Sequence, residues 1–235
     1  MKNQYFGDVS DYRKYGILRC IAEQGLRIGV LWMLTEDDGR TDGARTAYLG
    51  APAKWRGFDP LLFDLLVETV VHAPDRAVAR FEASDLLPDA LFHSEVLGDL
   101  VGQRRNFFDN ASASLDEADV IFFDPDNGIE VKSVARGAAG SRKYVYWTEL
   151  ERMWSEGHSL LVFQHFTRES RGALAQRLTE ELRARTSATF VSALVTSHVL
   201  FLAAAHADHA ERLSRGFDAA TERWAGQVAP VTSVG

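Results

Sequence analysis

The segment from Asp124 to Lys132 holds the densest group of chemically active side chains in the sequence. It contains two aspartates, an asparagine, a glutamate and a lysine, and it follows directly after the apolar run DVIFF. Asp, Pro, Asn and Gly are also favoured in turns for backbone reasons, and Asn127-Gly128 is a strong turn pair. Because purely structural turns rarely carry this many acids, we interpret the segment as the centre of a functional site.

The pair Asp124-Pro125 resembles the start of the motif Asp/Asn-Pro-Pro-aromatic, which marks class I S-adenosylmethionine-dependent methyltransferases that modify amino groups of nucleobases. In that family the acid or amide and the proline carbonyl hold the target amino group, and the aromatic ring stacks on a flipped-out base. Asp126-Asn127 replaces the second half of the motif, so the stacking ring is missing. The resemblance implies that Asp124 orients and polarises the acceptor amine and that the Pro125 carbonyl shares it. It also implies that Asp126 and Asn127 shape the pocket.

A second motif, GDVSDYRKY at residues 7–15, is similar to Gly-Asn-x-x-Asp-Val-x-Lys-His of the large-subunit ribosomal RNA adenine-N6 methyltransferases. The three-Cys-motif partner proteins, a methyltransferase-like group from mobile elements, have a comparable layout. The resemblance implies that Asp8, Asp11 and Lys14 help to bind S-adenosylmethionine or substrate. It also implies that the loop with Asp37 and Asp38 accommodates the ribose or amino group of the cofactor, although this loop lacks the family's usual glycine-rich turn.

A second interpretation of the same segment is a metal-dependent nuclease. Pro125-Asp126 followed by Glu130-Val131-Lys132 spells the Pro-Asp and Glu-x-Lys elements of restriction-endonuclease-like sites. In such sites, carboxylates hold Mg²⁺ and the lysine positions the attacking water or the phosphate. The corresponding carboxylates in this chain are Asp124, Asp126 and Glu130. The two elements usually lie on neighbouring strands of a hairpin, and three intervening residues are too few to cross and return. We therefore rank the nuclease second; a third interpretation is a catalytically inactive scaffold of a mobile-element or defence system.

Basic and aromatic residues indicate where a nucleic acid would bind. One group lies near the N-terminus and has two equally good interpretations. It could contact phosphates and stack on bases, or it could be the solvated basic side of a helix. Its members are Lys2, Tyr5, Tyr12, Arg13, Lys14 and Tyr15. A second basic group contains Arg136, Arg142 and Lys143, and Gly137 and Gly140 lie between them. We expect these residues to form a flexible loop that could close over a polyanion. Arg104-Arg105 could extend this surface. His165 follows an apolar strand and could act as a base or ligand. We expect substrate contacts from Tyr12, Arg13, Arg142, Lys143 and His165.

Composition narrows the function classes. With 33 acids against 26 bases, the 235 residues carry a formal net charge of −7, which argues against a non-specific coat on nucleic acid. A selective enzyme with an acidic pocket beside a basic rim stays compatible with that charge. The single cysteine, Cys20, excludes intramolecular disulfides and a cysteine-built zinc site. The longest apolar stretch, 191–205, is interrupted by polar residues, so we expect a cytoplasmic protein with no membrane partner.

Helical and strand-like periodicities alternate along the chain. We expect strands at 27–35, 76–81, 119–123, 159–163, 189–195 and 199–204. We expect helices at 10–24, 59–71, within 97–115, and at 144–155, 169–184 and 207–217. In the helix at 144–155, Thr148 and Glu151 have capping-box spacing. The pattern predicts one Rossmann-like α/β domain of three layers over residues 1–225 and a loose tail at 226–235. Its sheet is expected to be mostly parallel, with an antiparallel strand near one edge because the last two strands have a very short link.

Three polar segments follow expected strands, at 36–43, 124–128 and 164–165. In sheets of this kind, ligands bind beyond the carboxyl ends of the strands. We therefore expect the three segments to converge on one site.

Overall fold

The structure is a computed structural model that describes residues 1–39, 43–73 and 75–231. One sheet contains seven strands in the spatial order β2 (Leu91–His93), β1 (Ile28–Leu31), β3 (Val120–Phe123), β6 (Ser159–His165), β8 (Val199–Ala205), β7 (Phe190–Val195) and β9 (Ala229–Pro230). The first four strands in this order are parallel, and β8 is antiparallel to both of its neighbours. The expected mostly parallel sheet with a reversed strand near one edge is thus confirmed.

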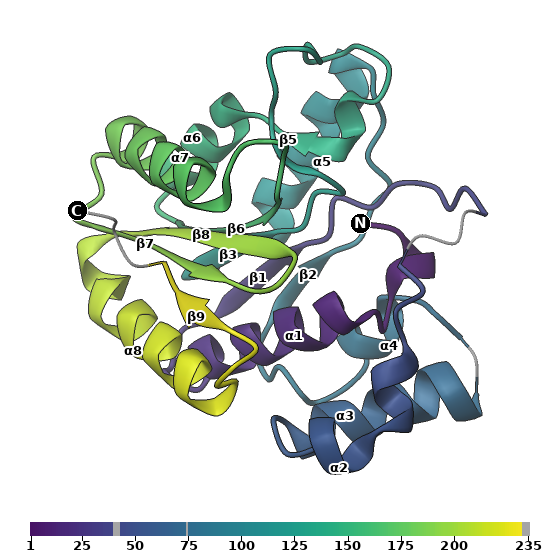
Figure 1. The fold of residues 1–235 in the computed structure, drawn as a ribbon. Coiled ribbons are helices and arrows are strands. Elements are labelled where there is room, and N and C mark those ends of the chain that lie inside the picture. Colours follow the sequence, from purple (N-terminus) through teal and green to yellow (C-terminus); the bar gives the residue numbers. More distant parts are fainter. Residues whose placement is uncertain (40–42, 74, 232–235) are drawn as a thin grey trace.

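Helices cover both faces of the sheet (Figure 1). The α-helices are α1 (Val9–Ala22), α2 (Pro52–Trp55), α3 (Pro60–Val67), α4 (Ala79–Glu82), α5 (Val101–Ser114), α6 (Trp147–Ser155), α7 (Arg171–Thr186) and α8 (Ala207–Arg223). Short 3₁₀ turns lie at Asn3–Tyr5, Ala47–Gly50 and Ser141–Lys143, and a π-turn lies at Glu68–His72. Helices α1, α3, α4 and α8 share one apolar cluster with the sheet, and α5, α6 and α7 share the other. The result is the expected three-layer arrangement.

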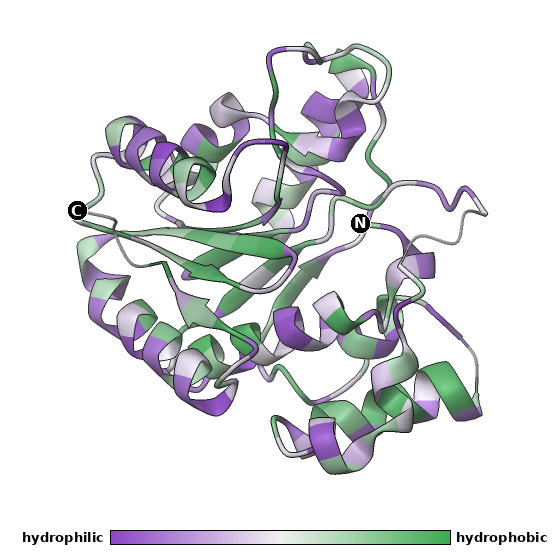
Figure 2. Cartoon of the chain, viewed as in Figure 1, coloured by the Kyte–Doolittle hydropathy of each residue, from purple (hydrophilic) through white to green (hydrophobic). Residues whose placement is uncertain are grey.

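The central strands are apolar on both faces because both faces are covered. In β3, Val120 and Phe122 belong to the first apolar cluster, whereas Ile121 and Phe123 belong to the second. Figure 2 shows the same distribution: the central strands are mostly hydrophobic, while the helices carry their hydrophilic residues on the outside. Among the described residues, no helix is long and apolar enough to cross a membrane.

Helix α1 packs along α8, although the two are far apart in sequence. A Cβ atom on Gly16 would lie 2.0 Å from Trp224 of the segment that follows α8, so the helix can approach this ring only where it has no side chain. Arg13 donates to Gln227 at 2.6 Å. Together with α3 and the sheet, this contact leaves almost every residue of α1 buried. Tyr12, Arg13 and Tyr15, which were expected on a solvated or nucleic-acid-binding side of this helix, are buried instead.

Several expected elements differ from the structure. Residues 76–81, expected as a strand, lead into helix α4, whose turn buries Val78 and Phe81 together; the sheet strand in this region is β2 instead. Helix α6 is capped by Tyr146 and Glu149 rather than by Thr148 and Glu151. The expected loose tail is also partly ordered, because Val228 is buried and β9 pairs with β7; residues 232–235 lie outside the described part.

A second, two-stranded parallel ladder lies beside the main sheet. It joins β4 (Gly128–Ile129) to β5 (Tyr144–Val145). The 13 residues between Glu130 and Tyr144 thus leave and return at the Asp124 segment. This fixes where the basic residues of 131–143 lie relative to the expected site.

Candidate functional site

A cavity of about 610 Å³ lies at the carboxyl ends of β1, β3 and β6. The Asp124 segment forms one wall, and the start of α1, the segment at 43–45 and the end of β6 form the others. Its lining residues are Met1, Tyr5, Asp8, Ser10, Asp11, Lys14, Gly43, Ala44, Arg45, Asp124, Pro125, Asp126, Asn127, Phe163 and His165. The segments at 124–128 and 164–165 meet here as expected, because the carboxyl ends of parallel strands share one edge of the sheet. Among the described residues of the segment at 36–43, Gly43 alone lines the cavity.

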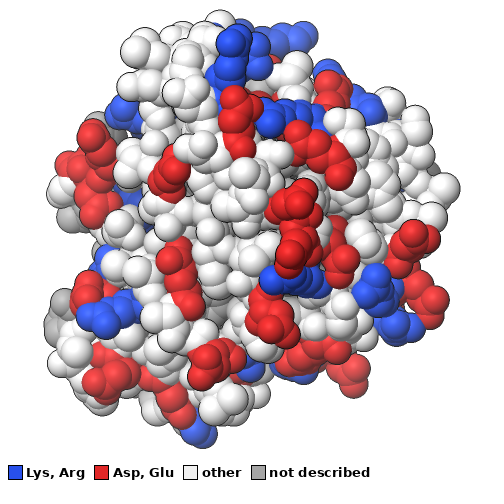
Figure 3. Space-filling view, turned by 180° about the vertical axis from the view of Figure 1, so that it is seen from behind, with Lys and Arg blue, Asp and Glu red and all other residues white. Residues whose placement is uncertain are grey.

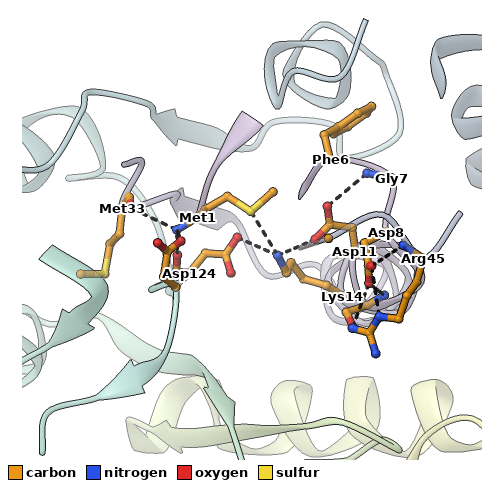
Figure 4. A network of polar contacts seen from close by, with 12 residues as sticks. Met1, Phe6, Gly7, Asp8, Asp11, Lys14, Met33, Arg45 and Asp124 are labelled. Atoms are coloured by element: carbon orange, nitrogen blue, oxygen red, sulfur yellow. Dashed lines mark hydrogen bonds and ion pairs between the residues drawn. The ribbon is translucent and has the colours of Figure 1, made fainter. Parts of the chain in front are cut away.

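Lys14 is the central cation of the site (Figure 4). Its Nζ atom lies 2.8 Å from Asp11 Oδ1 and 2.7 Å from Asp124 Oδ2, and its side chain is only 2% exposed. The same Nζ atom lies 4.7 Å from the centre of the Phe163 ring. Burial disfavours the charged ammonium, but the two carboxylates outweigh it and raise the pKa of Lys14 to about 12. The two motifs, 110 residues apart in sequence, are therefore held together by an ion pair.

The environment of Asp11 disfavours its charged carboxylate form, despite its lysine partner. Burial raises the pKa of Asp11 to about 6, while Lys14 pulls it down and the Asp124 charge pushes it up. Asp11 Oδ2 also accepts a hydrogen bond from the Gly7 backbone N–H at 3.2 Å. The pKa of this carboxyl group therefore lies above its ordinary value even with Lys14 as its partner.

Asp8 joins the start of α1 to the segment at 43–45. Its carboxylate caps the helix by accepting from the Ser10 backbone N–H at 2.8 Å. It also accepts from both Nε and Nη2 of Arg45 at 3.2 Å. Capping and a bidentate guanidinium pair together fix the carboxylate at the cavity wall.

Asp126 is held by a second cation. Its Oδ1 atom lies 2.7 Å from the Met1 ammonium, and Thr35 Oγ1 donates to Oδ2 at 3.0 Å. The same ammonium donates to the backbone carbonyls of Met33 and Asp124 at 3.2 and 3.0 Å. Burial alone would raise the pKa of Asp126, but the ammonium and the Thr35 hydroxyl hold it below its ordinary value.

Gln164 fixes the backbone of the Asp124 segment. Its Oε1 atom accepts from the Ile129 N–H at 2.8 Å, and its Nε2 atom donates to the Asn127 carbonyl at 3.4 Å. Gly128 has a φ of +127°, and a Cβ atom there would lie 2.3 Å from Gln164 Oε1. Glycine is therefore required at this position both by backbone conformation and by close approach.

His165 lines the cavity at the end of β6. Its backbone N–H donates to the Asn127 carbonyl at 3.1 Å, and its ring packs edge-on against Phe163. Burial, reinforced by the Lys14 charge, lowers the pKa of His165 to about 4. The imidazole is thus neutral at physiological pH and able to accept a proton.

Other expected site residues lie away from the cavity wall. Tyr12 is fully buried in the aromatic core, where it stacks on Tyr48 and its hydroxyl donates to the Trp55 carbonyl. Arg13 is also buried and turned toward Gln227. These two expected substrate contacts are not available to a ligand, because tertiary packing covers the sides of α1 that carry Tyr12 and Arg13.

The two acids expected to bind the cofactor through the loop after β1 are bound by the N-terminal segment instead. Asp37 accepts from the Gln4 backbone N–H, and Asp38 pairs with Lys2 at 2.5 Å. Part of the expected loop, residues 40–42, lies outside the described residues. Arg142 pairs with Asp99 at 3.5 Å, and Lys143 accepts from the Asn127 N–H through its carbonyl. None of these four side chains lines the cavity.

The carboxylates of the alternative metal site are separated in their roles. Asp124 and Asp126 each have a cation of the chain as partner. Glu130 lies on the other side of Gln164 and accepts from the Trp147 N–H at the start of α6. Among the residues that the structure describes, no group of three or more potential metal ligands is found.

Three cavity residues and one residue that supports the cavity belong to no motif in the sequence. The cavity residues are Met1, Arg45 and Phe163, and the supporting residue is Thr35. The contacts of Met1, Thr35 and Arg45 reach partners 37 to 125 positions away. Only Phe163 had a weak signal, as the last apolar residue of an expected strand.

Comparisons with protein-family models, curated proteins and solved structures give no match for this chain.

Proposed function

We propose that this chain is a class I methyltransferase-like protein that uses S-adenosylmethionine to methylate an amino group of a nucleic acid. The observation that carries the proposal is the Lys14–Asp124 ion pair inside the cavity. It joins the only two segments that resemble the family, and sequence spacing alone did not require them to meet. The position beyond the carboxyl ends of the strands is also where such sheets bind ligands.

The cavity suits such a cofactor in size and in chemistry. Its volume of about 610 Å³ lies within the range of roughly 300–1,000 Å³ found for small-molecule sites. Asp8 and Asp11 would hold hydroxyl or amino groups of the cofactor, since carboxylates accept hydrogen bonds from both. The Phe163 ring offers an apolar surface beside them. When bound, S-adenosylmethionine would supply an electrophilic methyl group.

The residues of the chain would then bind the acceptor and remove its proton. Lys14 contacts Asp124 through Oδ2, which leaves Oδ1 to accept a hydrogen bond from the acceptor amine. The Pro125 carbonyl would accept the second one. As the N–CH3 bond forms, the bond from the methyl group to the sulfonium sulfur would break and S-adenosylhomocysteine would leave with the electron pair of that bond. The amine nitrogen would lose one proton, which an imidazole nitrogen of His165 would accept. Because a nucleobase amine that has just been alkylated is strongly acidic, even an imidazole with a pKa of about 4 can take this proton.

A thermal-shift titration tests the proposal. If S-adenosylmethionine binds the folded chain at 100 times its Kd, it stabilises the fold by about 2.7 kcal/mol and raises Tm by about 5–10 °C for a protein of this size. Asp126→Asn should weaken this shift, whereas Asp116→Asn, an exposed aspartate outside the cavity, should leave it unchanged. The absence of any shift at millimolar S-adenosylmethionine would refute the proposal. A shift with Mg²⁺ that disappears in Asp126→Asn would support the nuclease instead.

A further inference from the structure

The loop at 131–143 concentrates positive charge on an acidic protein. Its bases are Lys132, Arg136, Arg142 and Lys143, and it contains no acid, although the whole chain has a net charge of −7. The end of the loop at Lys143 adjoins the cavity wall, because the Asn127 N–H donates to the Lys143 carbonyl at 2.9 Å. The Glu130 N–H donates to the Val145 carbonyl at 2.8 Å, which holds the start of the loop beside its end. The charge therefore lies beside the Asp124 segment.

Hydrogen bonds anchor the second half of the loop, which was expected to be flexible because of its glycines. Asp99 accepts from the Gly140 N–H, the Ser141 hydroxyl and the Arg142 N–H at 2.7–3.2 Å. Arg104 donates to the Ser141 and Tyr144 carbonyls at 3.1 and 3.0 Å. Arg104 is itself held by a buried bidentate pair with Glu149, at 2.9 and 2.7 Å. Residues 140–144 of the loop and its end are therefore anchored to Asp99 and Arg104.

Three of the loop bases have no acidic partner. Within the described part of the chain, no carboxylate lies at ion-pair distance from Lys132, Arg136 or Lys143. The same holds for Arg105, which shares a cleft of about 210 Å³ with Arg136 and Val101. On the outer helices, by contrast, Arg152, Arg177 and Arg185 each pair with two carboxylates. In Figure 3, Lys and Arg side chains gather at the top of the molecule, where Figure 1 places α5 and this loop.

We infer that the basic surface, defined as Arg105, Lys132, Arg136 and Lys143, binds the phosphate backbone of a single-stranded nucleic acid. Unneutralised Lys and Arg side chains on an anchored loop suit phosphates, whose binding releases counterions. A single strand fits better than a duplex, because a base in it can reach the cavity without being unpaired. The inference rests on the proposed function for the identity of the polyanion.

Fluorescence anisotropy with a fluorescein-labelled, single-stranded RNA of about 20 nucleotides tests the inference in about 25–200 mM KCl. The informative variant is Arg105→Gln/Lys132→Gln/Arg136→Gln, whose three side chains are exposed. The control is Lys54→Gln/Arg80→Gln/Arg215→Gln, which removes the same charge from exposed sites on α2, α4 and α8. We expect the first variant to bind at least tenfold more weakly and to flatten the slope of log K against log[salt] by about 2, at roughly 0.7 per lost contact. The control should change affinity less than about twofold.

Equal losses in the two variants, or no RNA binding by the wild type in low salt, would overturn the inference. Binding of phosphatidylserine vesicles through the same three side chains, without binding of RNA, would overturn it as well. The S-adenosylmethionine thermal shift is measured on the same variant and should be unchanged. RNA binding through the basic surface without that shift would refute the proposed function alone, whereas a normal shift without RNA binding would refute only this inference.

Discussion

Replacement of Lys14 by methionine should destabilise the fold in a strongly pH-dependent way. Methionine keeps most of the side-chain volume but removes the cation that lies between Asp11 and Asp124. Breaking a buried ion pair by removing one partner typically costs about 3–5 kcal/mol, because an uncompensated charge remains in the interior. We expect a loss of this size in the free energy of unfolding at about pH 8.

The pH dependence follows from Asp11. Burial raises its pKa to about 6 with Lys14 present, and removal of the lysine should raise it further. A carboxyl group whose pKa is higher in the folded state than in the unfolded state stabilises the fold at low pH. As the pH rises above the unfolded-state pKa, this stability is lost at about 1.4 kcal/mol per pH unit, until the pH passes the folded-state pKa. In the wild type the loss ends near pH 6, but in Lys14→Met it continues. The destabilisation should therefore be about 2–3 kcal/mol larger at pH 8 than at pH 6.

Urea unfolding of both proteins, followed by tryptophan fluorescence at the two pH values, measures this difference. Asp11→Asn in the Lys14→Met background should remove most of the pH dependence. Arg223→Met is the control, because its ion pair with Glu23 is 36% and 43% exposed and should contribute less than about 1 kcal/mol at either pH. If Lys14→Met cost less than about 1 kcal/mol, or the same at both pH values, the buried charge arrangement described above would be incorrect.

Three further perturbations report on other parts of the site and its support. Gly128→Ala adds a Cβ atom 2.3 Å from Gln164 Oε1 at a φ of +127°, and should lower the urea unfolding free energy by about 2–4 kcal/mol. Gly16→Ala places a Cβ atom 2.0 Å from Trp224 and should cost about 1–3 kcal/mol, with a shift in tryptophan emission. In its neutral form, His165 favours the folded state at pH values above 6.5, its pKa in the unfolded chain. This contribution of about 3 kcal/mol is lost as the pH falls to about 4, the pKa in the folded state. His165→Asn should therefore flatten that part of the curve of unfolding free energy against pH.

Each of these predictions has a clear contrary result. Gly102→Ala, where an added Cβ meets nothing within 4 Å, should change stability by less than about 0.5 kcal/mol and serves as the control for both glycines. Losses for Gly128→Ala or Gly16→Ala no larger than that of this control would contradict the close contacts. Superimposable pH profiles for the wild type and His165→Asn would show that the imidazole is not buried in its neutral form.

The sequence was most informative where local pattern and sheet geometry act together. DVIFF predicted β3, because a buried parallel strand reads as a continuous apolar run, and the carboxyl-end rule placed Asp124 and His165 at one edge. Strand β2 has only three residues, too few for a periodic signal, and residues 76–81 were mistaken for a strand. Tyr12 and Arg13 look like a solvated basic and aromatic surface until tertiary packing covers them. No local pattern contains that information.

The contact between α1 and α8 has a consequence for the synthesis of this protein. Arg13 and Gln227 are 214 residues apart, which at roughly 5–20 residues per second separates their appearance from the ribosome by about 10–40 s. During that interval the apolar side of α1 that will face Trp224 has no partner. Helix α1, which carries Asp11 and Lys14, can pack on α3 and the sheet before that time, but its contact with Trp224 forms only after residues 207–227 have been made. We therefore expect this side of α1 to be a binding site for a chaperone on the nascent chain until α8 docks.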